Sequence, residues 1–165
     1  MNLCPFARRE LDSGRVRFHC SRAETAEGLM LDLQDELLLL AREPDIETTV
    51  LVHPGVLAVF SDYLDFLELA DALLEQGGWQ GEFQIASFHP DYQFEGAGPD
   101  DVENYSNRSP YPMLHLLREA SLELAIDSHP DTAEIPRRNI ELLRSKGLEE
   151  VKALRRGAFS AMKRD

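Results

Sequence analysis

The fold is decided around TTVLV at residues 48–52, a short run of β-branched side chains that predicts a buried strand. A helical segment precedes it, from about Ala23 to Arg42, and places four leucines on one apolar stripe. A second helical segment follows it, from about Val56 to Gln76, and ends at a pair of glycines. A strand with a helix of this length on each side is typical of an α/β sheet.

Two further strands are predicted outside these helices. Residues Val16–Cys20 alternate apolar and polar side chains, and Glu82–Phe88 begins in the same way. Residues 15–89 therefore have the order strand, helix, strand, helix, strand, which favours parallel strands joined by right-handed crossovers. We expect an α/β protein with a small parallel or mixed sheet of three to four strands. A ferredoxin-like α+β sheet is the alternative.

The rest of the chain is predicted to be a long loop followed by helices. Residues 90–109 are polar, lack periodicity and exceed the length of an ordinary connection, so we expect a functional loop. Ser109 and Pro110 are suited to begin a helix with an apolar stripe of leucines. Two more helices are expected at 136–146 and 148–159.

Composition favours one cytoplasmic domain, 1–165, with its core in 15–89, the loop in 90–109 and C-terminal helices in 110–160. No apolar run approaches the ~20 residues that cross a bilayer, and the first residues do not resemble a signal peptide, so we expect no membrane partner. Seventeen basic residues against 30 acidic ones give a net charge of −13, which argues against nucleic acid as a partner. The basic run Lys152–Arg156 is expected to be a solvated helix face.

Three histidines fall at or near the carboxyl ends of predicted strands: His19, His53 and His89. If the strands are parallel, these ends share one edge of the sheet, outside which open α/β sheets bind their ligands. The alternative is that each histidine has a structural role and hydrogen-bonds a loop carbonyl.

His115 and Glu119 are four residues apart and would share a face of the helix predicted to begin at Pro110. Together with His89 they would form a 2-His-1-carboxylate set, which suits a divalent metal ion with open coordination positions. The alternative is a histidine at the core boundary that is hydrogen-bonded to a carboxylate.

Asn107, Arg108 and Ser109 precede the same predicted helix. The first N–H groups of a helix favour negative charge, and an arginine adds a bidentate donor for carboxylate or phosphate. We therefore expect these three residues to bind an anionic substrate. The alternative is a helix cap in which Arg108 pairs with an acidic side chain of the preceding loop.

Cys4 is a candidate nucleophile or redox partner, provided that a folded neighbour lowers the pKa of its thiol. The alternative is an inert cysteine. Cys20 shares a strand face with Val16 and Phe18 and is expected to be structural. The segment HPDT at 129–132 could bring His129 and Asp131 beside the site.

Four segments carry a further signal: NLCPFA at 2–7, SFHPDYQF at 87–94, NRSPYPMLHLLRE at 107–119, and HPDT through PRRN at 129–139. Together they resemble the bacterial family known as domain of unknown function 1415. The resemblance implies no particular reaction. It does imply that the signature segments of that family coincide with the candidate residues above, Cys4 included.

The favoured hypothesis is an enzyme acting on a small anionic substrate. His89 and His115 would serve as acid and base or as metal ligands, with Glu119 orienting an imidazole. A non-catalytic protein that binds a metal ion, cofactor or anionic metabolite is the first alternative. A scaffold protein that uses its acidic helices is the second.

Overall fold

A computed structural model describes residues 3–4, 7–128 and 132–162. Its elements alternate as the sequence predicts up to the third strand. None of the helices in these ranges is long and apolar enough to cross a membrane. In chain order, the elements are α1 (Ala7–Asp12), β1 (Val16–Cys20), α2 (Ala26–Arg42), β2 (Thr48–Val52), α3 (Phe60–Gln76), β3 (Phe83–Phe88), the 3₁₀ helix η1 (Val102–Ser106), β4 (Met113–Arg118), α4 (Glu119–Ser128), the 3₁₀ helix η2 (Thr132–Glu134), α5 (Ile135–Lys146) and α6 (Leu148–Met162).

The sheet is mixed, and its four strands have the order β1-β2-β4-β3. Strand β2 is parallel to β1, whereas β4 is antiparallel to both of its neighbours. Strands β1, β2 and β3 therefore run in one direction, with β4 inserted in the opposite direction. This confirms the predicted α/β class. The chain order also differs from the βαββαβ order of the ferredoxin-like alternative.

The prediction of a helix that begins at Pro110 is wrong. Residues Met113–Arg118 form strand β4, and the helix begins only at Glu119. In β4, Leu114 and Leu116 are fully buried, while His115 between them faces the other side of the sheet. Both edges of β4 pair with a neighbouring strand, so its backbone groups are satisfied along the whole ladder. This pairing and burial override the helical preference of a leucine-rich run.

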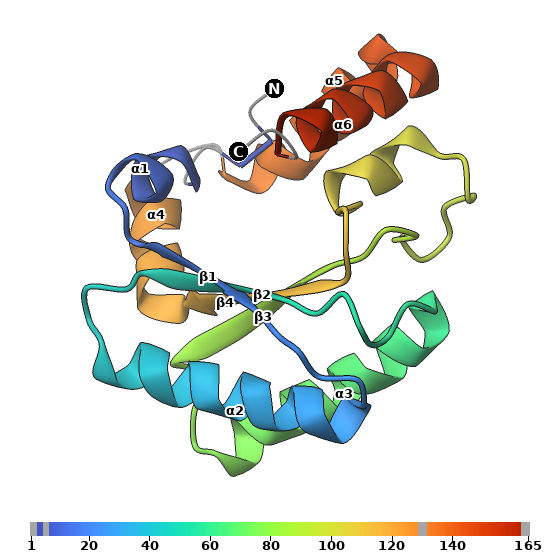
Figure 1. The fold of residues 1–165 in the computed structure, drawn as a ribbon. Helices are drawn as coiled ribbons and strands as arrows, with labels where there is room; N and C mark the ends of the chain where they lie inside the picture. Colours follow the sequence, from blue (N-terminus) through green and yellow to red (C-terminus); the bar gives the residue numbers. More distant parts are fainter. Residues whose placement is uncertain (1–2, 5–6, 129–131, 163–165) are drawn as a thin grey trace.

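Helices α2 and α3 cover the same face of the sheet (Figure 1). Both crossovers progress in the same direction across the sheet, and right-handed crossovers then place both helices on one side. The predicted leucine stripe of α2 is confirmed as the centre of the core. The fully buried residues of this core include Leu29, Leu33, Leu37, Leu40, Leu51, Tyr63, Leu114 and Leu116.

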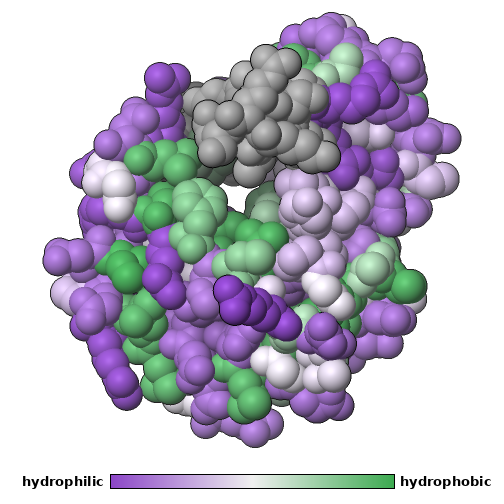
Figure 2. All heavy atoms as spheres, viewed as in Figure 1, coloured by the Kyte–Doolittle hydropathy of each residue, from purple (hydrophilic) through white to green (hydrophobic). Residues whose placement is uncertain are grey.

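The opposite face of the sheet, which we call the open face, is only partly covered. Helices α5 and α6 lie on this side at a distance from the strands (Figure 1), and apolar side chains gather around a hollow in this part of the molecule (Figure 2). On the edge strand, Phe18 is 64% exposed. The open face consists of Val16, Phe18 and Cys20 of β1, Thr48, Val50 and Val52 of β2, Met113, His115 and Leu117 of β4, and Gln84, Ala86 and Phe88 of β3.

The hydroxyl of Tyr63 joins the ends of β3 and β4. Tyr63 lies on α3 and is fully buried, and its hydroxyl donates to the Met113 carbonyl (2.8 Å) and accepts from the Phe88 amide (3.1 Å). Phe88 and Met113 are the last pair of the β3–β4 ladder. One side chain therefore satisfies two backbone groups where the two strands separate.

Replacing this hydroxyl should destabilise the protein. Tyr63→Phe leaves the Phe88 amide and the Met113 carbonyl without this partner, and it should lower the free energy of unfolding by about 1–3 kcal/mol in urea denaturation. Tyr111→Phe is the control, because Tyr111 is 50% exposed. Its effect should stay within about 0.5 kcal/mol. Equal losses in the two variants would contradict a special role for Tyr63.

Candidate functional site

The strand-end histidines lie along the carboxyl edge of β1, β2 and β3, as predicted, but their side chains are used differently. His53 and His89 follow the last residues of β2 and β3 and are fully buried. His19, on β1, faces α2, where its Nδ1 lies 3.3 Å from Oε1 of the buried Glu36. Arg17 binds the same carboxylate with two hydrogen bonds of 2.7 and 2.9 Å. His19 therefore belongs to an ion-pair cluster against α2.

His89 fastens two loops together. Its Nδ1 accepts from the Asp91 amide (3.0 Å), so Nε2 carries the proton and donates to the Leu57 carbonyl (3.1 Å). Leu57 has a φ of 58°, a conformation that is costly for a side chain of this size. Burial lowers the pKa of His89, which keeps the imidazole neutral. Because both of its ring nitrogens are hydrogen-bonded, His89 has a structural role, which was the alternative to a ligand-binding role.

His53 is the second buried imidazole at this edge. Its Nδ1 lies 3.2 Å from the Val56 carbonyl, and its ring stacks on Tyr63 at a centroid distance of 5.9 Å. Its Nε2 is buried and has no hydrogen-bond partner within the described ranges. Burial lowers the pKa of His53 to about 4, so the ring is neutral at pH 7.

His115 occupies the centre of the open face. It lies between Val50 of β2 and Ala86 of β3, and its ring contacts Phe88 at a centroid distance of 6.3 Å. The Thr48 hydroxyl donates its single proton to the Leu116 carbonyl (2.5 Å), so Thr48 Oγ1 accepts from His115 Nε2–H (2.7 Å). This contact fixes the tautomer. Burial lowers the pKa of His115 to about 4, and Nδ1 keeps its lone pair.

The predicted metal set of His89, His115 and Glu119 is not brought together. His89 packs against α3, whereas His115 faces the opposite side of the sheet. Glu119 follows the far end of β4, about 20 Å from His89 at ~3.3 Å per strand residue. Among the described residues, no group of three histidines, cysteines or acidic residues is arranged to hold a metal ion.

The predicted anion ligands organise the loop before β4. Arg108 donates from Nε to the Tyr92 carbonyl (3.0 Å) and from Nη2 to the Pro99 carbonyl (2.7 Å). Asn107 Nδ2 donates to the Ser87 carbonyl (3.1 Å), and the Ser109 hydroxyl donates to the Tyr111 carbonyl (2.6 Å). Because a strand follows them, these residues do not precede a helix N-terminus. The amides of a helix N-terminus therefore do not support anion binding by Asn107, Arg108 and Ser109.

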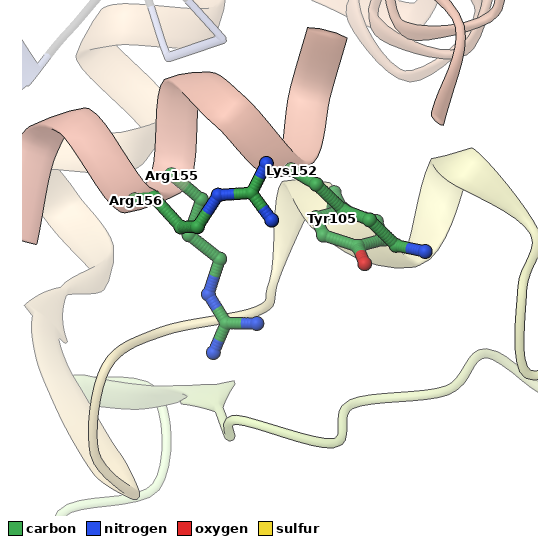
Figure 3. A pocket seen from close by; sticks show the side chains of 4 residues that line it. All are labelled: Tyr105, Lys152, Arg155 and Arg156. Carbon is green, nitrogen blue, oxygen red and sulfur yellow. The ribbon is translucent and has the colours of Figure 1, made fainter. Parts of the chain in front are cut away.

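A basic pocket lies directly beside this loop, between η1 and α6. We use this name for the cavity of about 170 Å³ lined by Tyr105, Lys152, Arg155 and Arg156. Arg155 points from α6 toward the loop that leads into β4 (Figure 3), where its Nη2 donates to the Ser109 carbonyl (2.7 Å). Arg108 stacks on the Tyr105 ring at 4.7 Å.

The sequence signal for this pocket was weak. Lys152, Arg155 and Arg156 have the i, i+3, i+4 spacing of one helix face, and this face was expected to be solvated. That interpretation fits the exposed Arg156 but not Arg155, whose burial lowers the pKa of its guanidinium. The pocket also needs Tyr105, which lies on η1 and is distant in sequence from α6.

The two cysteines are both exposed free thiols. Cys20 lies on the open face at the edge strand, as its alternation predicts. Cys4 follows Leu3, whose carbonyl accepts from Asn139 Nδ2 of α5 (2.8 Å). Two signature segments of the sequence therefore meet at this contact. His129 and Asp131 lie outside the described residues.

The buried histidines predict how stability depends on pH. An ordinary histidine has a pKa near 6.5, whereas His53 and His115 have values of about 4 in the folded protein. The unfolded chain therefore binds more protons below pH 6.5, and stability falls as the pH decreases toward 4. Between pH 7 and 5 each histidine should cost about 2 kcal/mol of unfolding free energy.

His115→Phe should remove its share of this slope in urea denaturation at pH 7, 6 and 5. His53→Phe should do the same, because the two rings lie on opposite faces of the sheet and titrate independently. An unchanged slope in both variants would show that other groups cause the pH dependence.

Comparison with known proteins gives a family but no characterised relative. No curated protein and no solved structure matches the chain. The family described as "Protein of unknown function (DUF1415)" matches residues 1–153, which include all four strands, η1 and two of the four residues that line the basic pocket, Tyr105 and Lys152. The chain belongs to this family.

Proposed function

We propose that the protein binds a small anionic molecule in the cytoplasm, with the anionic group held in the basic pocket. The observation that carries this proposal is the convergence of three cationic side chains, Lys152, Arg155 and Arg156, on one cavity in a chain of net charge −13. Lys152 also pairs with Glu149 of the same helix (3.5 Å). An anion in the pocket would interact favourably with the cationic groups that line it.

The volume of the pocket and the net charge of the chain favour a small ligand over a polymer. A cavity of about 170 Å³ has room for a carboxylate, sulfate or phosphate group and a few further atoms. The net charge of −13 would repel a nucleic acid chain, which carries a charge at every phosphate. Arg108 stacks on the ring of Tyr105, which lines the pocket.

Binding is better supported than catalysis. The catalytic set predicted from the sequence is divided between two faces and two edges of the sheet, and both nitrogens of His89 are engaged. His115 is the one member of that set whose Nδ1 has no hydrogen bond to the described residues. A neutral imidazole of this kind acts as a hydrogen-bond acceptor for a ligand.

The proposal predicts saturable binding of inorganic phosphate in isothermal titration calorimetry at low ionic strength. Arg156→Met should weaken this binding about tenfold or more, since a charge-assisted hydrogen bond contributes about 1.5–3 kcal/mol. Lys152→Met should also weaken it, by a smaller factor, because a single-point cation lacks the bidentate geometry of arginine. Added sodium chloride should weaken the binding by screening.

Arg137→Met is the matched control. Arg137 is 60% exposed and pairs with Glu134 of η2 and Glu141 of α5, so this variant removes the same charge away from the basic pocket. Its affinity for phosphate should equal that of the unmodified protein. The proposal fails if phosphate does not bind, or if Arg137→Met and Arg156→Met weaken binding equally.

A further inference from the structure

The open face contains an imidazole nitrogen that the fold does not use. Thr48 takes the Nε2 proton of His115, which leaves the Nδ1 lone pair on a surface made mainly of apolar side chains. Val50 and Ala86 flank the ring, and the Phe88 ring contacts it. One fixed acceptor within an apolar surface is the arrangement that orients a small organic ligand.

Three of the residues that line the basic pocket belong to α6, which lies on the same side of the sheet as the open face (Figure 1). His115 belongs to that face. Arg155 reaches the Ser109 carbonyl, and the Ser109 amide donates to the carbonyl of His89, the residue after β3. Phe88 pairs with Met113 and Ala86 pairs with His115, so His115 is three strand positions further along the sheet. At ~3.3 Å per residue, His115 lies about 10 Å from the contact between Ser109 and His89.

We infer that the open face binds the body of the ligand whose anionic group occupies the basic pocket, and that this ligand is an organic acid with an apolar body and an N–H or O–H donor at the end away from the acid. The inference rests on the proposed anion site. The donor binds His115 Nδ1, and the body lies against Val50, Ala86 and Phe88.

The observations favour a small molecule over a second copy of the chain. A second copy would bring another net charge of −13 to the surface. It would also have to reach the sheet beneath α5 and α6, which lie on the same side (Figure 1).

Three related probes separate the parts of this inference. The first, 6-(p-toluidino)naphthalene-2-sulfonate, carries a sulfonate and an N–H at opposite ends of its naphthalene rings, with a p-tolyl ring beyond the N–H. Naphthalene-2-sulfonate lacks the N–H donor together with the p-tolyl ring, and N-(p-tolyl)-2-naphthylamine lacks only the sulfonate. The full probe should bind with 1:1 stoichiometry and enhanced fluorescence, more tightly than either partial probe, and phosphate should compete with both sulfonates.

Each variant should weaken the binding of a different subset of the three probes. His115→Phe should weaken the full probe and the neutral amine about tenfold and leave naphthalene-2-sulfonate unchanged. Arg156→Met should weaken both sulfonates and leave the neutral amine unchanged. Ala86→Leu fills the space beside His115 and should weaken all three probes without changing phosphate binding. Leu31→Ala, on the exposed side of α2 and away from the open face, is the control and should change none of them.

A measurement on the unmodified protein removes the dependence on variants that fold poorly. Long-range ¹H–¹⁵N correlation spectra should show His115 protonated at Nε2, and the Nδ1 resonance should move upfield when the full probe is added. An unchanged Nδ1 resonance under saturating probe would overturn the inference. So would equal affinity of the full probe for the unmodified, His115→Phe and Ala86→Leu proteins, or a change to a dimer in place of 1:1 binding.

These results also distinguish the two proposals. Phosphate binding that depends on Arg156, together with probe binding that ignores His115 and Ala86, would leave the basic pocket in place and reject the ligand class. A neutral amine held by His115 in a protein that does not bind phosphate would reject the anion site and, with it, the shared ligand.

Discussion

The structure depends on the insertion of β4 between β2 and β3. Strand β3 has no other neighbour in the sheet, so it is joined to β1 and β2 only through β4. The inserted strand is fixed at both ends: Tyr63 binds it where it enters, and Arg118 donates to the carbonyls of Leu40 (2.6 Å) and Ile46 (3.0 Å) where it leaves. These contacts connect the strand to α3, to α2 and to the loop before β2. The same insertion places His115 at the centre of the open face.

The first half of the fold could be predicted because its signals are local. Alternation in β1, β-branched residues in β2 and the leucine stripe of α2 each appear within one segment, and the direction of the crossovers follows from chirality. Strand β4 could not be recognised in this way. Its leucines fit a helical stripe as well as a strand, and the pairing that decides between them comes from residues 48–52 and 83–88, which are distant in sequence.

The contacts that set the roles of the candidate site residues could not be predicted from the sequence. The predicted segments do meet near the carboxyl edge of the parallel strands, but the role of each residue depends on distant partners. His89 is committed by the Leu57 carbonyl, and Arg108 by the carbonyls of Tyr92 and Pro99. No spacing rule identifies a backbone carbonyl as the partner of a side chain. The basic pocket could not be predicted for a related reason, since its cations and its aromatic ring come from separate elements.

The connection between β3 and β4 begins and ends at the same edge of the sheet, because the two strands are antiparallel neighbours. A crossover between parallel strands must span the sheet, so its length is tied to the helix that it contains. The β3–β4 connection carries no such obligation, and residues can be gained or lost within it while the ladder keeps its register. Since this connection supplies Tyr105 and Arg108, evolution can alter the rim of the basic pocket without rebuilding the sheet. The composition of this pocket rim and the folding stability are thereby separable in this architecture.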